Sequence, residues 1–485
     1  MDGRLLFVAA ALLLTACTGL QEKQAIDRLR PCKHADGPTE GYCGTLDVFE
    51  DREAKSGRKI PLKIIVFPAL KRTAAKDPLF FLAGGPGQGA AAIADVGREM
   101  LRKIGADRDL VFVDQRGTGK SNPLECKPDE KDQDAEDDYD EAKSVARLRA
   151  CMEKLQEKAD LTKYTTTIAM DDLDDVRQYL GYGQINLYGG SYGTRAAIVY
   201  ARRHTASTRA IILDGVAPTD MRLPLFMARD SQRALSLLLR DCAADKGCNA
   251  RFPNLAARLE KLLAAPAKKI RYIHPRTGIE KEGEARRLVL GGTMFAALYS
   301  PKMASLVPLL IEQAEKGIYT GFFALGAAFD PAANSIAQGM HLSVVCAEDA
   351  PRIEPGSIAR ETAGTFLGAE MAEIRLKACQ FWPKGKVDAD YFDNTPINIP
   401  TLILSGDLDP VTPPVWGQQI AGAWKNSRHI IVPATGHGAA AAGCVPKLMA
   451  QFLNEGTAAN LDPACVQQVK RPPFVLGPSG PDPLP

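Results

Sequence analysis

The sequence predicts an α/β protein with a mostly parallel, doubly wound sheet and a large inserted helical lid. Short apolar segments of strand length alternate with segments whose apolar residues recur at helical spacing, a pattern typical of a parallel sheet covered by helices. This alternation stops over residues 222–392, where helical patterns follow one another, and then resumes. We therefore expect a sheet domain in two parts, residues 44–221 and 393–470, with the lid between them.

Length and charge set the outer limits of the prediction. The chain has 485 residues, of which 45% are hydrophobic and 24% charged, and its formal net charge is +2. A chain of this length buries a large core and suggests two or three domains. The nearly neutral charge gives no reason to expect nucleic acid as a partner. Composition leaves the oligomeric state open.

Residues 1–17 carry the pattern of an export signal. Arg4 precedes an apolar run over residues 5–14, which is too short to cross a bilayer comfortably. The run leads into Leu-Thr-Ala-Cys17, which resembles a bacterial lipoprotein signal with cleavage before Cys17 and lipid on that residue. An ordinary secretory signal with an incidental cysteine is the alternative. We expect an exported protein, periplasmic or at the cell surface, held by lipid to a bacterial membrane, with residues 18–43 as a tether and N-terminal segment.

The residues after Cys17 refine this location. Thr18-Gly19 carries no acidic residue, which in bacterial lipoproteins favours the outer membrane of a Gram-negative cell. Several acyl chains on one residue would anchor the protein stably, because one chain alone holds only marginally.

The other cysteines support export. Eleven cysteines less Cys17 leave an even number, and none of them forms a Cys-x-x-Cys metal pattern. An oxidising compartment would let neighbours close as disulfides, although sequence alone does not prove their connectivity. The neighbouring couples are Cys32/Cys43, Cys126/Cys151, Cys242/Cys248, Cys346/Cys379 and Cys444/Cys465.

The remaining elements follow in chain order. The first two predicted strands have an antiparallel character, and the later ones are buried and bounded by turn residues. An acidic run over residues 129–141 predicts a solvated loop, and the Pro- and Gly-rich tail, residues 471–485, predicts disorder. Strands are expected at residues 44–50, 59–67, 78–83, 109–114, 185–188, 208–214, 400–405 and 427–432, and helices at 165–180, 195–200, 225–239 and 255–263.

One predicted strand runs directly into a glycine-flanked serine. Residues 185–188 are followed by Gly189-Gly190-Ser191-Tyr192-Gly193 and then by an apolar helical stretch. Strand, tight turn and helix in this order are the setting of a nucleophile elbow, in which a strained turn exposes the serine hydroxyl. The flanking glycines are needed because a Cβ there would collide with the neighbouring strand and helix. Ser191 is the candidate nucleophile, and a glycine-rich turn that merely contains a serine is the alternative.

A base and an acid must complete such a site. A serine hydroxyl is a poor nucleophile until a base removes its proton, and the base needs a carboxylate to orient it. Of the six histidines, only His437 follows the last predicted strand on a loop of small residues. Asp409 follows the preceding strand in Gly406-Asp407-Leu408-Asp409, where the spacing after the glycine lets the chain turn first. We predict Asp409 as the acid, with Asp407 as the alternative.

The tetrahedral intermediate of acyl transfer carries an oxyanion that needs backbone donors. One donor is expected at the N–H of Tyr192, directly after the nucleophile. The other is expected in the glycine loop after residue 83, at Gly85, where no side chain blocks the approach.

Two motifs in the same region imitate nucleotide sites. Gly85-Pro86-Gly87-Gln88-Gly89-Ala90 fits the dinucleotide fingerprint, with Asp114 at the end of the next strand as the ribose ligand. Pro86 removes a donor from that loop, which favours the oxyanion role. Residues 117–121 imitate the end of a phosphate loop, but Asp114 occupies the position of its first glycine and Pro123 prevents the helix that should follow.

With these residues assembled, the chain resembles an α/β-hydrolase of the proline iminopeptidase and tripeptidyl aminopeptidase family. The likeness spans about residues 61–452. Ala83 stands where many iminopeptidases have histidine, which indicates the larger secreted tripeptidyl group. The motifs that carry the likeness are Gly84-Gly85-Pro86-Gly87, Asp114-Gln115-Arg116-Gly117-Thr118-Gly119, Gly189-Gly190-Ser191-Tyr192-Gly193, Gly406-Asp407-Leu408-Asp409 and Gly436-His437-Gly438.

The resemblance implies a serine exopeptidase that cleaves near the free N-terminus of peptides, of tripeptidyl or prolyl type, with no metal or cofactor. It also implies that lid carboxylates bind the α-amine of the substrate. By position, Glu348 and Asp349 are the candidates, and structural acids beside a cysteine are the alternative. A carboxylesterase or lipase on the same fold, and a non-catalytic binding protein on this scaffold, are the alternative functions.

Overall fold

The structure is a computed structural model. The predicted export signal with Cys17, and nearly all of the acidic run, lie outside the residues that it describes. Within the described part of the chain, no helix is both long enough and apolar enough to cross a membrane. The described residues are 28–33, 40–71, 75, 77–126, 141–274, 277–328, 336–393, 395–477 and 479–480.

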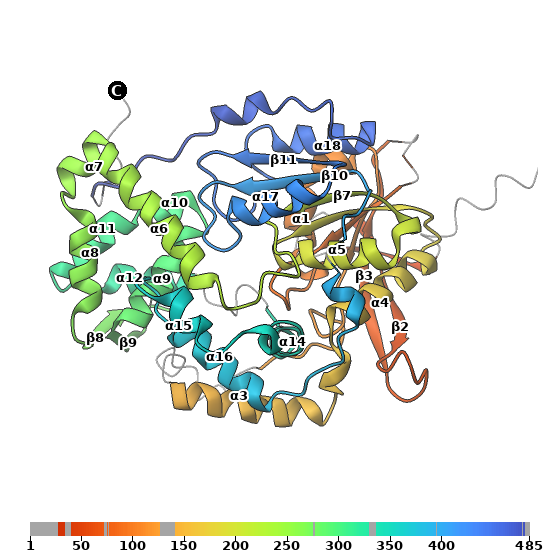
Figure 1. Cartoon of the computed structure of the whole chain (residues 1–485), viewed down its shortest axis with the longest axis horizontal. Helices are drawn as coiled ribbons and strands as arrows, with labels where there is room; N and C mark the ends of the chain where they lie inside the picture. The colour runs from red at the N-terminus through yellow and green to blue at the C-terminus, as the bar shows by residue number, and fades with distance from the viewer. Residues whose placement is uncertain are drawn as a thin grey trace, which may run out of the picture.

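A nine-stranded sheet forms the centre of the described structure, in the order β1-β2-β3-β5-β4-β6-β7-β10-β11 (Figure 1). The first three strands and the β3–β5 pair are antiparallel, and the neighbours from β5 to β11 are parallel. The predicted α/β-hydrolase fold is therefore confirmed. The bounds are β1 Arg30–Lys33, β2 Glu40–Phe49, β3 Lys59–Phe67, β4 Leu79–Leu82, β5 Leu110–Val113, β6 Ile185–Gly190, β7 Thr208–Asp214, β10 Thr401–Gly406 and β11 Ser427–Val432.

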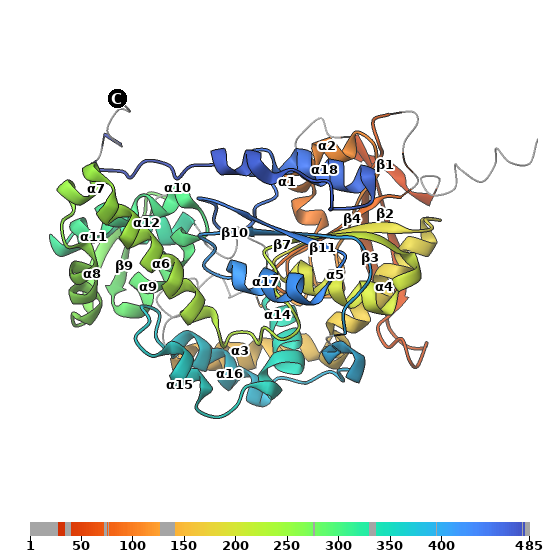
Figure 2. The same ribbon diagram turned by 45° about the horizontal axis from the view of Figure 1, so that its top comes forward.

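Helices cover both faces of this sheet, which explains why its inner strands are apolar along their whole length. On β7, Ile211 and Leu213 enter one core cluster, whereas Ala210 and Ile212 enter the other. Figure 2 shows one set of helices above the sheet and the other below it. The upper set is α1 (Ala94–Met100), α2 (Arg102–Gly105) and α18 (Val445–Glu455), and the lower set is α4 (Thr166–Tyr179), α5 (Tyr192–Arg203) and α17 (Pro414–Ala423).

The insertion between β7 and β10 has two differently anchored parts. Its larger part has a hydrophobic core of its own and includes a two-stranded hairpin, so the lid is not purely helical. Residues of α14 and the end of α16 instead join the core cluster beneath the sheet. The elements are α6 Met227–Ala244, α7 Lys246–Arg251, α8 Leu255–Ala264, β8 Lys268–Ile273, β9 Glu280–Ala285, α9 Arg287–Leu298, α10 Pro301–Ala304, α11 Val307–Glu315, α12 Thr320–Ala328, α14 Gln338–Val344, α15 Ser357–Thr362 and α16 Glu370–Phe381.

The chain ends differ from their predicted roles. The segment expected to be a tether, residues 18–43, contains β1 and the start of β2, both in the sheet. The tail after residue 470 was expected to be disordered, but its described part leaves α18 and crosses to the lid near α7 (Figure 1). There Phe474 is buried in the lid core, and the N–H of Val475 donates to the Ser305 carbonyl at 3.1 Å. The apolar residues of this segment outweigh its Pro and Gly content.

Five disulfides join the couples that are neighbours in the sequence. They are Cys32–Cys43, Cys126–Cys151, Cys242–Cys248, Cys346–Cys379 and Cys444–Cys465. The fourth joins the turn after α14 to α16, which places both elements against the core beneath the sheet.

Candidate active site

Ser191 lies at the sharp turn between β6 and α5. Its backbone has φ 56° and ψ −126°, a strained conformation for a residue with a side chain. A Cβ on Gly189 would lie 2.3 Å from the Gly193 carbonyl oxygen, and one on Gly193 would lie 2.1 Å from the Leu82 oxygen. Both glycines are therefore required by close approach, as the elbow motif predicts. The Ser191 side chain is partly exposed.

The glycine loop after β4 lies beside this serine. A Cβ on Gly84 would lie 3.2 Å from Cβ and 3.7 Å from Oγ of Ser191. Gly85 has φ +108°, and a Cβ there would lie 2.7 Å from the Gly87 nitrogen. Only glycine suits this tight backbone, so the loop brings its peptide groups close to the nucleophile.

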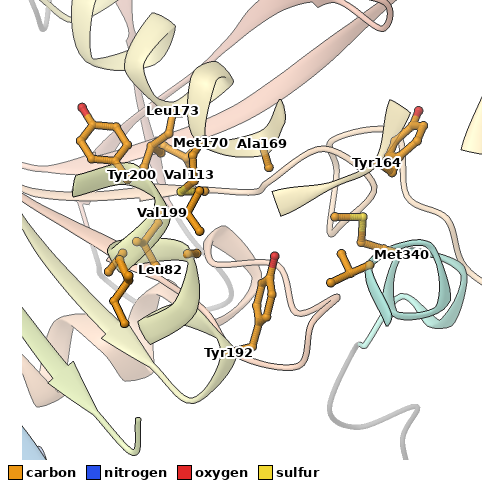
Figure 3. Packing of buried hydrophobic residues seen from close by; sticks show 14 of the residues in the cluster. Leu82, Val113, Tyr164, Ala169, Met170, Leu173, Tyr192, Val199, Tyr200 and Met340 are labelled. Carbon is orange, nitrogen blue, oxygen red and sulfur yellow. The ribbon is translucent and has the colours of Figure 1, made fainter. Parts of the chain in front are cut away.

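Tyr192 opens α5, so its N–H belongs to the first helical turn, where backbone donors lack intrahelical partners. Its side chain points away from solvent, into the core cluster between Leu82 and Val199 on one side and Met340 on the other (Figure 3). The Tyr192 hydroxyl donates to Thr166 Oγ1 at 2.6 Å. Tyr192 thus has a backbone N–H without an intrahelical partner and a side chain that is held in the core.

His437 and Asp409 form a direct pair. Nδ1 of His437 lies 2.8 Å from Oδ2 of Asp409. The other oxygen of Asp409 accepts from the N–H groups of Val411 and Thr412, each at 2.8 Å. Asp407, the alternative acid, instead accepts from the Thr435 N–H at 3.3 Å. The structure therefore brings Asp409, and not Asp407, to the histidine.

Asp409 and His437 each shift the pKa of the other. Burial opposes charge on the His437 ring, but Asp409, with a further contribution from Asp214, raises the pKa of His437 above its ordinary value. Burial also opposes charge on Asp409, but the charge and hydrogen bond of His437 and the two backbone donors lower the pKa of Asp409 below its ordinary value. A neutral histidine with its Nδ1–H held by a carboxylate leaves Nε2 free to accept a proton.

Asp214 connects the serine to the histidine loop. Its carbonyl oxygen accepts from the Ser191 N–H at 2.9 Å. Its buried carboxylate accepts from the N–H groups of Ala439 and Ala440 at 2.7 and 3.0 Å, two and three residues beyond His437. Within the described residues there is no hydrogen bond between Ser191 Oγ and the His437 ring. Hydrogen bonds of this kind are often long in unliganded enzymes and tighten when substrate binds.

The lid contributes Tyr299, which the sequence motifs did not indicate. It directly follows α9, and its ring lies edge-on to the His437 ring with 5.1 Å between centroids. Its carbonyl oxygen accepts from the His437 N–H at 3.0 Å. A Cβ on Gly436 would lie 2.2 Å from that same oxygen, which explains the glycine before His437. No local pattern around residue 299 marks this role, because the contact depends on how the lid folds back.

The two acids predicted to bind a substrate amine have other partners. Glu348 is 1% and Asp349 0% exposed. Glu348 accepts from the Thr166 N–H at 2.6 Å, the Thr166 hydroxyl at 2.8 Å and the Tyr391 hydroxyl at 2.7 Å. Asp349 forms an ion pair with Arg195 of α5, with 2.9 Å between Oδ2 of Asp349 and Nη1 of Arg195.

These contacts correct the prediction from position alone. All four carboxylate oxygens of Glu348 and Asp349 already have donors, so neither residue presents a free anion to a substrate. Their role in this structure is to fix the helix that follows the nucleophile.

Asp114, the acid required by the alternative nucleotide site, is also bound by other groups. Asp114 is 1% exposed, and it accepts from the Ala91 N–H at 2.7 Å and the Lys120 N–H at 2.9 Å. Its carboxylate therefore holds two loops together rather than facing a ribose. Among the described residues, no cluster of three or more His, Cys, Asp or Glu side chains is placed to hold a metal ion.

A glycine-flanked serine at positive φ, followed by a helix, and a histidine–aspartate pair after the last two parallel strands define a serine hydrolase of the α/β-hydrolase fold. The family model described as alpha/beta hydrolase fold matches residues 77–244, which include Ser191. The model described as TAP-like protein matches residues 364–465, which include Asp409 and His437.

Individual relatives extend this match. Serine protease Hip1 of Mycobacterium tuberculosis is 27% identical over 504 residues, which cover 93% of this chain and 94% of that protein. Proline iminopeptidase of Neisseria gonorrhoeae is 28% identical over 159 residues, or 32% of this chain and 35% of that protein. The chain therefore contains an α/β-hydrolase segment and a TAP-like C-terminal part, it is similar to α/β-hydrolase peptidases, and it is a serine hydrolase.

A crystal structure of proline iminopeptidase from Mycobacterium smegmatis is 16% identical, with a TM-score of 0.37 over 85% of this chain and 98% of that one. The fold assignment rests on the sheet order and the two family models rather than on this superposition.

Proposed function

We propose that this chain is an exported serine exopeptidase that removes residues from the free N-terminus of peptides, in the manner of a tripeptidyl or prolyl aminopeptidase. The observation that carries the peptidase assignment is the likeness to serine protease Hip1 over 93% of the chain. Export is supported by five disulfides and by the signal-like N-terminus. In this proposal Cys17 carries the lipid that holds the enzyme to a bacterial membrane.

The proposed first step is acylation of Ser191. Nε2 of His437 takes the proton from the Ser191 hydroxyl as its oxygen bonds to the scissile carbonyl carbon. Asp409 holds the ring through Nδ1 at 2.8 Å and stabilises the imidazolium that forms. The negative charge that develops on the carbonyl oxygen is received by the N–H groups of Tyr192 and Gly85.

Collapse of this intermediate breaks the peptide bond. The imidazolium of His437 gives its proton to the departing amine, which leaves the amino-terminal fragment as an ester on Ser191. Water then attacks the ester, His437 takes one of its protons, and the same proton returns to the Ser191 oxygen as the acid product departs. Each step uses a group that lies at the carboxyl edge of the parallel strands.

The lid supports exopeptidase action in this proposal. Tyr299 contacts the His437 ring, so the insertion directly covers the base rather than lying at a distance from it. A covered site restricts the length of chain that can approach, which favours peptide ends over the middle of folded proteins.

The test compares three matched substrates on purified enzyme. Peptides with a free amino-terminus, the same peptides with an acetylated amino-terminus, and short acyl esters are assayed with wild type and Ser191→Ala. We expect the free peptides to be cleaved with a kcat/KM at least tenfold above that of the acetylated ones. Ser191→Ala should lose several orders of magnitude in kcat with an unchanged melting temperature. Faster turnover of the esters than of every peptide would replace this proposal with an esterase.

A further inference from the structure

The glycine loop after β4 has little internal support. Gly85 has φ +108° and Gly87 has φ +111°, and residues without a Cβ can adopt many other conformations. The hydrogen bonds inside the loop are long: the Gln88 N–H donates to the Gly84 carbonyl at 3.3 Å, and the Gly84 N–H donates to the Gln88 side chain at 3.4 Å. Other segments must therefore fix the loop if the Gly85 N–H is to receive an oxyanion.

The insertion supports this loop just before α14. The Ala337 N–H donates to the Gly87 carbonyl at 2.9 Å, and Gln88 and Ile336 form an antiparallel bridge. A Cβ on Gly87 would lie 2.7 Å from the Ala337 carbonyl oxygen and 3.1 Å from the Ile336 side chain. The two backbones are therefore in direct contact, and this close approach requires the glycine at position 87.

His341, on α14, contacts the same loop with its side chain. Its Nδ1 lies 3.3 Å from the carbonyl oxygen of Pro86, the residue between Gly85 and Gly87. A carbonyl oxygen only accepts, so Nδ1 carries the hydrogen and the ring donates. Burial lowers the pKa of His341 to about 3, so this ring stays neutral at any pH at which a histidine acts as a catalytic base.

The segment that makes these contacts is itself anchored. The Gly339 N–H donates to the Leu124 carbonyl at 2.8 Å, and a Cβ on Gly339 would lie 2.6 Å from that oxygen. Met340 is fully buried in the core cluster beneath the sheet, across from Tyr192 (Figure 3). His341 therefore projects from a fixed backbone, and the hydrogen bond from its ring restricts the orientation of the Pro86 carbonyl.

We propose that His341 is a positioning residue for the oxyanion hole. Its ring and the Ala337 N–H hold two successive carbonyl groups, those of Pro86 and Gly87, directly after Gly85. Because proline fixes its own φ, the orientation of the Pro86 carbonyl restricts the backbone before it. His341 thereby keeps the Gly85 N–H directed at the place where the oxyanion forms. The inference rests on the proposed mechanism, in which Gly85 supplies an oxyanion donor, and it adds to that mechanism a residue of the insertion.

A positioning role of this kind affects the transition state more than the bound substrate. The oxyanion develops only as the tetrahedral intermediate forms, so a misdirected donor lowers kcat and leaves KM nearly unchanged. Removal of one oxyanion donor costs about 10²–10³-fold in kcat. Loss of the His341 hydrogen bond leaves the donor in place but less well directed, so the expected loss is smaller.

The experiment compares His341→Leu with His341→Asn. The amide of Asn can place an N–H donor where Nδ1 of the histidine lies, whereas Leu has a similar size and no donor. The values of kcat and KM are measured on free peptides and on short acyl esters. The rate constant for labelling of Ser191 by a fluorophosphonate probe is measured as well, because the phosphonyl oxygen enters the same oxyanion hole and no peptide is needed.

We expect His341→Leu to lose about tenfold to hundredfold in kcat and in the labelling rate constant, with KM within about twofold of wild type. His341→Asn should restore both rates to within about threefold of wild type. Equal losses in the two variants, or wild-type labelling of His341→Leu, overturn the proposal. A wild type that is labelled and cleaves esters but no peptides refutes the exopeptidase function alone, and the esters and the probe then test His341. Absence of labelling in wild type overturns both.

His204→Leu is the matched control. The His204 ring is also partly buried and hydrogen-bonded, with Nε2 3.0 Å from Oδ1 of Asp171. His204 follows the last residue of α5, at the opposite end of that helix from Ser191, so its loss should leave kcat and the labelling rate constant within about twofold of wild type. Melting temperatures of all variants are recorded. A loss in His204→Leu equal to that in His341→Leu would assign the effect to general destabilisation and would overturn the positioning role.

Discussion

Two aspartates of one loop have different partners. Asp409 contacts the imidazole of His437, and Asp407, two residues earlier, accepts from the backbone of the histidine loop. The first carboxylate orients the base, and the second holds the loop that carries it. Both carboxylates contact the loop that carries Thr435 and His437, so their positions in the sequence do not show which of them is the catalytic acid.

A pair of substitutions distinguishes the two carboxylates. Asp409→Asn should reduce kcat by about 10⁴-fold, because an amide no longer selects the tautomer in which Nδ1 carries the hydrogen. Asp407→Asn should keep kcat within about tenfold of wild type. Steady-state rates on the free peptides measure both, with melting temperature as the control for folding. Equal losses in the two variants would contradict the assignment of the acid.

The pH dependence of catalysis should report the field around His437. The base works only when neutral, and Asp409 and Asp214 raise its pKa above the ordinary value of 6.5. We expect kcat/KM to fall on the acid side with an apparent pKa above 6.5. Asp214→Asn removes one of the two negative charges, so the acid limb should move to lower pH.

The control for this shift is Asp107→Asn, which removes a carboxylate that forms an ion pair with Lys71. Profiles of kcat/KM between pH 5 and 9 are compared for the two variants and wild type. An unchanged acid limb in Asp214→Asn, or the same movement in Asp107→Asn, would contradict the role given to Asp214.

Among the elements, α5 is held from the side opposite the sheet. The π-helical turn η6 (Val345–Asp349) follows α14 and supplies two buried carboxylates to this region. Asp349 binds Arg195 on α5, and Glu348 reaches Tyr192 through the Thr166 hydroxyl. A segment of the insertion therefore fixes the helix whose first residue follows the nucleophile.

Glu348→Gln tests this structural role. The amide keeps one acceptor but brings an NH₂ group to hydroxyls that donate, so we expect the free energy of unfolding to fall by about 1–3 kcal/mol. The ratio of kcat/KM between free and acetylated peptides should stay unchanged. Urea unfolding and the two assays measure these quantities. A selective loss on the free peptides would instead restore the amine-binding role.

Sequence patterns predicted the parts of the site whose constraints are local. The elbow requires small residues at 189 and 193, and His437 follows the last strand on a loop. The elbow and the histidine could therefore be identified from the sequence. The role of Glu348 was wrongly predicted, since position cannot tell a free carboxylate from one that is already bound. Tyr299 was missed because its contact joins elements that are distant in the chain, and the tail after 470 was misjudged because composition ignored Phe474.

At the scale of the whole molecule, we expect the disulfides to differ in their effect on the free energy of unfolding and on kcat. Cys346–Cys379 closes 33 residues and ties η6 to α16, whereas Cys32–Cys43 closes 11 residues at the edge of the sheet. Replacing both members of the first pair by Ala should lower the free energy of unfolding by about 3–4 kcal/mol, and replacing the second pair by about 2–3 kcal/mol.

Activity separates these two changes more clearly than stability does. Loss of Cys346–Cys379 should also reduce kcat, because η6 holds α5, while loss of Cys32–Cys43 should leave kcat unaltered. Urea unfolding and steady-state rates at a temperature where both variants are folded provide the comparison. A normal kcat without Cys346–Cys379 would show that η6 keeps its position unaided.

The contact between Tyr299 and His437 couples the position of the lid to the orientation of the catalytic base. The residue that follows α9 supplies both the ring and the carbonyl oxygen that hold the imidazole. A displacement of this end of α9 would therefore remove two contacts from His437 at once.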